Sequence, residues 1–259
     1  MIPIKSILQQ EFSLPKPILR NLIENVTAEH IKKLQQTCRY FYLKFNYNVI
    51  DGLWIEQRDT IYITNYNVSL SDKKIEFLQN NIYLNKRFIV SNVYENLGKL
   101  FQKIIKSDIY ELNIWHRNGL QLSDFAILAK SENLKCVKIY SYIYYSDEKK
   151  VPVEDILSYI PNATKFINEK CIITSNTSQK LFTLKRNTKF KWVSLDWISE
   201  LLDANLFNNF IKKNFDFDSD PNPLFELRGD HAKLQEIYEL VKIWREKSNF
   251  ELHDFLTII

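Results

Sequence analysis

The sequence predicts an α/β protein, with a small helical domain at residues 1–48 and a larger domain of strand–helix units at residues 49–259. Three observations support this division. Apolar residues between residues 14 and 45 recur at three- and four-residue steps, as in amphipathic helices. From about residue 53, short runs rich in β-branched and aromatic residues alternate with helical segments. The anchor residues of the later runs recur at a regular distance, which indicates a repeated unit.

Two short helices are expected in the N-terminal domain. Pro15 and Pro17 stand where the first helix can start, because proline lacks only an N–H that the first turn leaves unpaired. The apolar stripe of this helix consists of Ile18, Leu19, Leu22, Ile23 and Val26. The second helix, about residues 28–45, has Thr27 as its N-cap, with His30 where a capping box prefers Glu. Its stripe consists of Ile31, Leu34, Cys38, Phe41 and Phe45. A unit this small needs a further surface to bury its apolar residues.

The larger domain is expected to begin with strands at 53–55, 61–64 and 88–90 and a helix at 93–105. Four strand–helix units follow. Their strands are expected at residues 110–115, 137–144, 165–173 and 191–195. Their helices are expected at 122–129, 153–159 and 178–184, and through Leu206 and Phe210. Residues 215–223 are expected to form a loop, and residues 230–247 a helix that caps the array, with one apolar face made by Leu234, Ile237, Tyr238, Val241 and Trp244.

The strand anchors Leu112, Val137, Phe166 and Trp192 stand 25, 29 and 26 residues apart. This spacing is near that of leucine-rich repeats, although the ladder of Leu and Asn residues is irregular here. No unit can bury its own apolar face, so stacked neighbours would form one continuous core under a parallel sheet. We therefore expect a degenerate solenoid that is similar to leucine-rich repeats, and an ordinary closed α/β sheet stays as the alternative.

Charge and composition argue against several classes of function. The chain has 35 basic and 31 acidic residues, and its basic clusters are doublets such as Lys32-Lys33, so the stripe of a nucleic-acid binder is missing. The cysteines Cys38, Cys136 and Cys171 are widely spaced, as expected for reduced thiols. No stretch reaches the ~18 apolar residues of a membrane span. We expect an intracellular protein of the cytoplasm or nucleus that binds neither nucleic acid nor membrane.

No motif predicts catalysis, a cofactor or a metal. The chain has four glycines and no phosphate-binding or nucleophile-elbow motif, although a catalytic Cys–His pair that meets only in the fold stays open. Asp216, Asp218 and Asp220 alternate like calcium ligands, but Pro221 and Leu227 occupy the positions that need Gly and Glu. The histidines are too isolated in sequence for a zinc site: His30, His116, His231 and His253. We expect a protein that is not an enzyme.

The segment LPKPILRNLIENVTAEHIKKLQQTCRYFY, residues 14–42, resembles the F-box, a helical motif that docks on the Skp adaptor of cullin-type ubiquitin ligases. Leu14 and Pro15 match its opening Leu-Pro dipeptide, and Ile18 and Leu19 match its aliphatic pair. The remaining matches are Ile23, Val26, Ile31, Leu34, Thr37, Cys38, Arg39 and Phe41. Three positions depart from the pattern, since Pro17 replaces the usual Glu, His30 the usual Asp and Phe41 the usual Trp. The first two departures remove acidic groups that can contact the adaptor.

The resemblance implies helix-in-groove docking on a Skp-type adaptor and, through it, on cullin. The residues expected at this interface are Leu14, Pro15, Pro17, Ile18, Leu19, Leu22, Ile23, Val26, Ile31, Leu34, Cys38, Arg39 and Phe41. The remainder is similar to the C-terminal part of nematode-type F-box proteins, for example in the phrase VPVEDILSYIPNATKF. Together these resemblances imply a substrate-recognition subunit of an SCF-type ubiquitin ligase. The alternative is a scaffold, similar to leucine-rich repeats, with no ligase role.

The target protein is expected at exposed aromatic and charged residues near the strand ends, where parallel solenoids bind partners. Trp115, His116 and Arg117 form one such group, and Tyr142, Tyr144 and Tyr145 the next. The alternative interpretation is that Trp115 and most of these tyrosines point into the core.

Overall fold

The computed structural model describes residues 15, 17–18, 21, 25–37, 39–56, 60–65, 68–70, 78–93, 97–198, 202–215, 224–229, 234–237, 239 and 256–258. The chain consists of two compact units, residues 1–46 and residues 47–259. This division lies close to the predicted one between residues 48 and 49. Each unit is described by itself.

The N-terminal unit contains helices α2 (Ala28–Thr37) and α3 (Arg39–Lys44) where one helix over residues 28–45 was predicted. Cys38, between them, lies outside the described residues. The hydroxyl of Thr27 accepts the backbone N–H of His30 at 3.3 Å, so Thr27 caps α2 as its sequence position predicts. Phe41 and Phe45 stack with ring centroids 5.8 Å apart and are buried together with Ile31. These residues form the small core of the unit.

The second unit is built on an eleven-stranded sheet, counted over the part of the chain that the structure describes. The order of its strands is β13-β12-β11-β10-β8-β6-β4-β1-β2-β3, and β5 also pairs with β4. The bounds are β1 (Asn48–Glu56), β2 (Thr60–Asn65), β3 (Val68–Leu70), β4 (Ile82–Val93), β5 (Ile104–Ser107), β6 (Glu111–His116), β8 (Cys136–Ile139), β10 (Lys165–Asn168), β11 (Trp192–Ile198), β12 (Leu224–Gly229) and β13 (Leu256–Ile258). Two short strands, β7 (Leu120–Gln121) and β9 (Ile143–Tyr144), pair separately.

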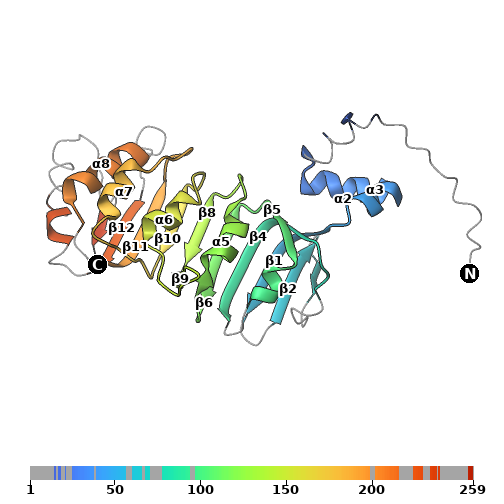
Figure 1. The fold of residues 1–259 in the computed structure, drawn as a ribbon, viewed down its shortest axis with the longest axis horizontal. Coiled ribbons are helices and arrows are strands. Elements are labelled where there is room, and N and C mark those ends of the chain that lie inside the picture. Colours follow the sequence, from blue (N-terminus) through green and yellow to red (C-terminus); the bar gives the residue numbers. More distant parts are fainter. Residues whose placement is uncertain are drawn as a thin grey trace, which may run out of the picture. The chain divides into compact units, whose positions relative to one another are not determined.

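The sheet is mostly parallel, and from β4 to β13 its main strands stand side by side in chain order (Figure 1). Among the described strands of this sheet, the pairs β1–β2 and β2–β3 are antiparallel and the others parallel. One register line crosses the parallel strands and consists of buried residues only: Leu53, Phe88, Leu112, Val137, Phe166, Val193 and Phe225. The two ends of the sheet do not pair with each other, so the described part of the chain forms an open α/β sheet.

Helices cover the face of the sheet on which this buried line lies. Their bounds are α4 (Gly98–Phe101), α5 (Leu122–Ala129), α6 (Val153–Ser158), α7 (Thr177–Thr183) and α8 (Ala204–Asn214). Figure 1 shows α5 to α8 following one another along the same side of the strands. Phe125 of α5, Leu181 of α7 and Phe207 of α8 are fully buried, so one continuous core lies between the two layers.

Several predicted element boundaries were wrong, and the strand predicted at 137–144 is divided into β8 and β9, which belong to different sheets. The helix predicted at 93–105 is only the short α4, and the chain then forms β5 beside β4. The long strand predicted at 165–173 ends at Asn168, whose side-chain oxygen accepts the backbone N–H of Lys170 at 3.2 Å. This local hydrogen bond takes the chain out of the ladder, which an apolar pattern alone does not indicate.

The anchor Trp192 was assigned to the wrong face. Val193, not Trp192, pairs with Phe166, whereas Trp192 pairs with Lys165. Successive side chains of a strand point to opposite faces, so this slip of one residue moves the tryptophan out of the core and onto the uncovered side of the sheet. The size of its apolar ring had suggested burial.

The C-terminal region differs from a single closing helix. Strands β12 and β13 were not predicted, and β13 continues the sheet beyond β12. Residues 234–237 and 239 are helical, as expected, with Leu234 and Ile237 buried. Of the predicted 215–223 loop only Phe215 is described, and it is buried and forms a β-bridge with Phe190. The rest of this loop and of the predicted 230–247 helix lies outside the described residues, as do Asp216, Asp218, Asp220, His231 and His253.

Candidate interaction surfaces

The N-terminal unit exposes apolar side chains in the segment that matches the F-box opening. Pro15, Pro17 and Ile18 are exposed, and 52% of the Ile18 side chain is accessible. On α3, Tyr42 and Leu43 are also exposed.

The other residues expected at an adaptor interface divide into two groups. Ile31, Phe41 and Val26 are buried and belong to the interior of the unit, while Leu34 is half-buried. The second group cannot be placed, because it lies outside the described residues or, for Arg39, only the backbone is described: Leu14, Leu19, Leu22, Ile23, Cys38 and Arg39. Among the described residues of the expected interface, the exposed apolar ones are therefore Pro15, Pro17 and Ile18.

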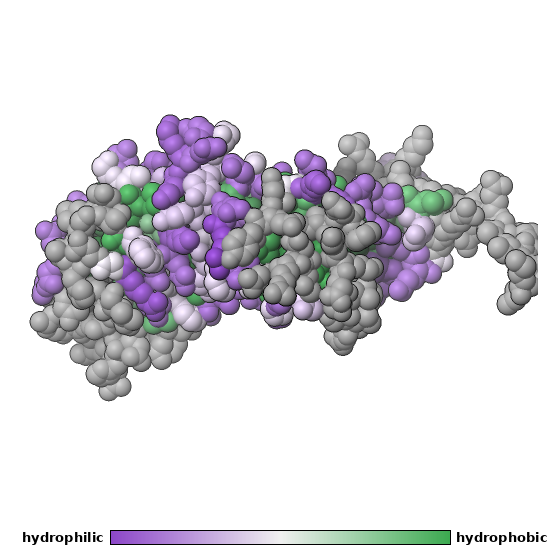
Figure 2. All heavy atoms as spheres, turned by 90° about the horizontal axis from the view of Figure 1, so that it is seen from below, coloured by the Kyte–Doolittle hydropathy of each residue, from purple (hydrophilic) through white to green (hydrophobic). Residues whose placement is uncertain are grey.

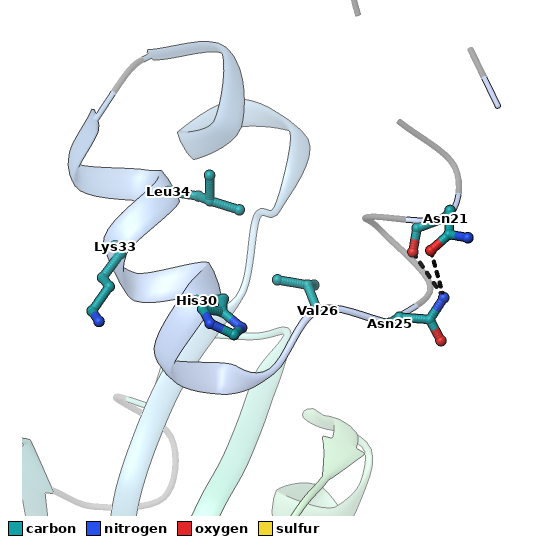
Figure 3. A pocket seen from close by; sticks show the side chains of 6 residues that line it. All are labelled: Asn21, Asn25, Val26, His30, Lys33 and Leu34. Atoms are coloured by element: carbon teal, nitrogen blue, oxygen red, sulfur yellow. Dashed lines mark hydrogen bonds between the residues drawn. The ribbon is translucent and has the colours of Figure 1, made fainter. Parts of the chain in front are cut away.

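A hollow of about 360 Å³ opens beside α2 in the same unit (Figure 3). Its apolar part is formed by Val26 and Leu34, whose side chains point toward one another in Figure 3. The other lining residues are Asn21, Asn25, His30 and Lys33. Asn25 donates two hydrogen bonds of 3.0 Å to Asn21, to the backbone and side-chain oxygens. The hollow thus combines a small apolar floor with amide, imidazole and ammonium groups.

In the second unit, the face of the sheet opposite the helices carries polar and aromatic side chains. We call it the open face and define it by two register lines. The first consists of Arg87, Glu111, Cys136, Lys165, Trp192 and Leu224. The second consists of Trp54, Ile89, Asn113, Lys138, Ile167, Ser194 and Glu226. All of these side chains except Ser194 are half-buried or exposed.

Cations exceed anions on the part of the open face between β4 and β10. Glu111 is shared by two cations, since Arg87 lies 3.1 Å and Lys138 3.7 Å from its carboxylate. Lys165 instead lies over the indole ring of Trp192, 3.2 Å from its centroid. Burial lowers the pKa of the Lys165 ammonium and raises the pKa of the Cys136 thiol between these groups. Three cations and one carboxylate therefore lie on four adjacent strands, and two of the cations pair with that carboxylate.

Next to β11 and β12, anions exceed cations. Arg228 lies 3.4 Å from Asp196 and 3.8 Å from Glu226. Burial raises the pKa of the Asp196 carboxyl, an effect that Arg228 opposes, and burial also raises the pKa of Glu169. Repulsion from Asp196 raises the pKa of Glu169 further. This end of the open face is acidic, with three carboxylates around one guanidinium.

Two exposed tryptophans lie at the other end of the open face. Trp54 of β1 is 44% exposed and contacts the ring of Tyr62 on β2, with centroids 6.3 Å apart. Trp115 of β6 is 48% exposed and lies two residues beyond Asn113, on the same side of the strand. Ile89 pairs with Trp54 across β1 and β4. Exposed tryptophans of this kind commonly anchor protein partners.

The residues predicted to bind a target take different positions. Trp115 belongs to the open face, whereas His116 is buried beneath the strand end, where its backbone N–H donates to the Ser141 hydroxyl at 2.6 Å. Arg117 is exposed and donates to the side-chain oxygen of Asn92 at 2.7 Å. Of these three consecutive residues, Trp115 and Arg117 thus lie at the surface and His116 lies in the interior.

The three tyrosines are half-buried and also separate. Tyr142 and Tyr144 contact edge to face, with centroids 6.2 Å apart, and Lys150 lies 3.8 Å from the centroid of Tyr142. Tyr145 points to α6, where its hydroxyl donates to Asp155. Burial and this hydrogen bond raise the pKa of Tyr145. The tyrosines therefore mainly join β9 to its neighbours.

The open-face residues Arg87, Ile89, Lys138 and Lys165 were missed in the sequence. The available signal was the alternation of each strand, because every second residue between buried anchors faces the same side. Aligning the strands on Leu112, Val137 and Phe166 would have grouped them.

Neither a metal site nor a membrane span is found in the described part of the chain: no three His, Cys, Asp or Glu side chains gather there, and no helix is long and apolar enough to cross a bilayer. Figure 2 shows mainly hydrophilic residues on the described surface seen from below, with smaller hydrophobic patches between them. Comparisons of the chain with protein-family models, curated proteins and solved structures gave no match.

Proposed function

We propose that this protein is a non-catalytic adaptor of an SCF-type ubiquitin ligase, acting in the cytoplasm or nucleus. Its N-terminal unit binds a Skp-type adaptor and, through it, cullin, while its sheet domain binds a target protein. Ubiquitin transfer is performed by other subunits. This protein contributes by tethering the target, because a bound target presents its lysines at high effective concentration to the conjugating enzyme.

The observation that carries the proposal is the exposure of Ile18 beside Pro15 and Pro17. These residues occupy the opening positions of the segment that resembles the F-box. They lie outside the core formed by Ile31 and Phe45, so burying them in a partner leaves that core intact. Docking of an apolar helical stripe into a partner's groove is a common mode of recognition.

The strand arrangement supports the second half of the proposal. Parallel strands that are neighbours both in the chain and in the sheet are typical of solenoids, in which each unit contacts only the next. The buried line through Leu112, Val137, Phe166 and Val193 fits repeats of 25, 29 and 27 residues. We infer a degenerate array similar to leucine-rich repeats, whose open face serves as the binding platform.

A pull-down with a purified Skp-type adaptor tests the first half. Wild-type protein should retain the adaptor, and Ile18→Asp should lose most of it, because a carboxylate cannot enter an apolar groove without a large desolvation penalty. The matched control is Ile105→Asp. Ile105 is 50% exposed, close to the 52% of Ile18, but lies on β5 of the other unit. Folded wild-type protein that leaves the adaptor in solution would refute the ligase role.

A scaffold without ligase function is the second candidate, and the replacement of the usual acidic residues by Pro17 and His30 favours it. In that case the sheet domain still binds its target. Failure of both wild type and Ile18→Asp to retain the adaptor, with both proteins folded, would favour this second function.

A further inference from the structure

We propose that the open face between β1 and β10 binds an extended segment of the target that has apolar residues at one end and carboxylates at the other. This inference specifies the target-binding half of the proposed function and rests on it. It concerns no residue of the N-terminal unit.

The surplus of positive charge on the open face indicates where the acidic end of the segment binds. Glu111 forms ion pairs with Arg87 and Lys138, and the described residues place no carboxylate within ion-pair distance of Lys165, which contacts the Trp192 ring. Lys165 is also partly desolvated, as the lowered pKa of its ammonium indicates. A carboxylate of a partner placed between Lys138 and Lys165 would neutralise the surplus in surroundings where water screens charges less than in bulk solvent.

The exposed aromatic residues identify the apolar end. Trp54 pairs with Ile89 across β1 and β4, and Trp115 of β6 pairs with Ser91, two residues further along β4 on the same face. The three side chains present two indole rings and an aliphatic group. Tryptophan contributes strongly to binding because its large ring is desolvated with little loss of conformational freedom. An aliphatic or aromatic side chain of the target fits this end.

Strand spacing sets the length of the segment. The strands β1, β4, β6, β8 and β10 are consecutive neighbours in the sheet. Neighbouring strands lie about 4.8 Å apart, so this row spans roughly 19 Å, which an extended chain covers in about six residues. The carboxylates should therefore stand four to six positions from the apolar residue, before it or after it in the segment.

The acidic part of the open face, near β11 and β12, determines how far the acidic end of the segment can extend. Around β11 and β12, the carboxylates of Glu169, Asp196 and Glu226 surround Arg228. These groups repel an acidic segment that extends beyond Lys165. Complementary charges and repulsive neighbours together determine the register of a bound partner.

Selection from a phage-displayed library of random twelve-residue peptides on the immobilised full-length protein tests the inference. The enriched peptides should carry two or more Asp or Glu residues four to six positions from an aromatic or aliphatic residue, with the same order in most of the peptides. Synthetic copies should bind Lys138→Glu/Lys165→Glu at least about tenfold more weakly than wild type, and Trp115→Ala several-fold more weakly. The matched control is Lys130→Glu/Lys185→Glu, which makes the same charge change at two exposed lysines away from the open face. Circular dichroism establishes that each variant is folded.

Three results would overturn the inference: no enrichment, enrichment of peptides without acidic residues, or equal affinity for wild type and Lys138→Glu/Lys165→Glu. Displacement of the peptides by a twelve-nucleotide oligothymidine at similar concentration would also overturn it, in favour of nucleic acid. Adaptor binding is measured on the same proteins. Loss of adaptor binding with intact peptide binding refutes the ligase role alone, and the converse refutes this inference alone.

Discussion

The ammonium group of Lys165 lies over the indole ring of Trp192, across the strand pair β10–β11 and 3.2 Å from the ring centroid. The ring supplies partial negative charge where the described residues place no carboxylate, and it stays on the uncovered side of the sheet. The contact explains how a partly desolvated lysine and a large aromatic ring are both accommodated outside the core. It also links β10 to the more acidic strands that follow.

A double-mutant cycle with Lys165→Met and Trp192→Leu should therefore give a favourable coupling energy of about 0.5–1 kcal/mol. The free energy of unfolding is measured by urea denaturation for the wild type, both single variants and the double variant. Additive effects within error would mean that the two side chains do not interact in solution.

Substitutions at two neighbouring residues of β10 should change stability by very different amounts, because only one of them belongs to the buried register line. Phe166→Ala should lower the free energy of unfolding by about 3–5 kcal/mol, because it removes a fully buried ring from the core. Ile167→Ala, on the open face, should lower it by about 1 kcal/mol, because Ile167 is only half-buried. Denaturant melts of the two variants compare these values. Similar losses would contradict the assignment of the two faces.

Gly119 is required by the turn between β6 and β7. Its φ of +76° is unfavourable for other residues, and a Cβ atom there would lie 2.6 Å from the carbonyl oxygen of Tyr142 and overlap the ring of Tyr144. Gly119→Ala should lower the free energy of unfolding by about 2–3 kcal/mol, measured by denaturant melts.

Glu148→Gly provides the complementary control for this effect. Glu148 has a φ of 64° in the turn after β9 and is exposed. Glycine relieves the backbone strain there, so the free energy of unfolding should rise by about 0.5–1 kcal/mol. A destabilised Glu148→Gly variant would indicate that the Glu148 side chain matters more than its backbone conformation.

The raised pKa of Asp196 predicts in which direction the free energy of unfolding changes with pH. Burial raises its pKa in the folded state above that in the unfolded chain, so the folded protein binds the proton more tightly. The contribution of Asp196 to stability therefore improves as the pH falls through the folded-state pKa. The free energy of unfolding of Asp196→Asn, relative to that of the wild type, should be highest near pH 7 and should fall toward pH 4. Urea melts of both proteins across this range, subtracted pairwise, measure the slope, and a difference that grows toward low pH would contradict the assignment.

Much of the fold was accessible from the sequence, because short apolar runs and helical stripes reflect burial directly. The helix at residues 122–129 and the anchors Leu112, Val137 and Phe166 lie where their patterns predicted. Trp192 was misplaced because a large ring beside a lysine can be accommodated outside the core, and hydropathy does not distinguish the two faces. Strands β12 and β13 were missed because their short runs depend on pairing with distant strands.

The candidate surfaces were less accessible from the sequence. Trp115 was identified from its position at a strand end, and the structure exposes it. His116 beside it is buried, because the next residue of a strand faces the opposite side. The charge imbalance around Glu111 arises from residues on three strands, far apart in the chain, so it emerges only once the register of the sheet is known.

The adaptor role is tested most directly by hydrogen–deuterium exchange of the full-length protein with and without a saturating Skp-type adaptor. The proposed function predicts slower exchange of backbone amides in peptides from residues 15–46, including those around Ile18 and Leu43, and little change in residues 47–259. Unchanged exchange in residues 15–46, or protection confined to residues 47–259, would contradict it.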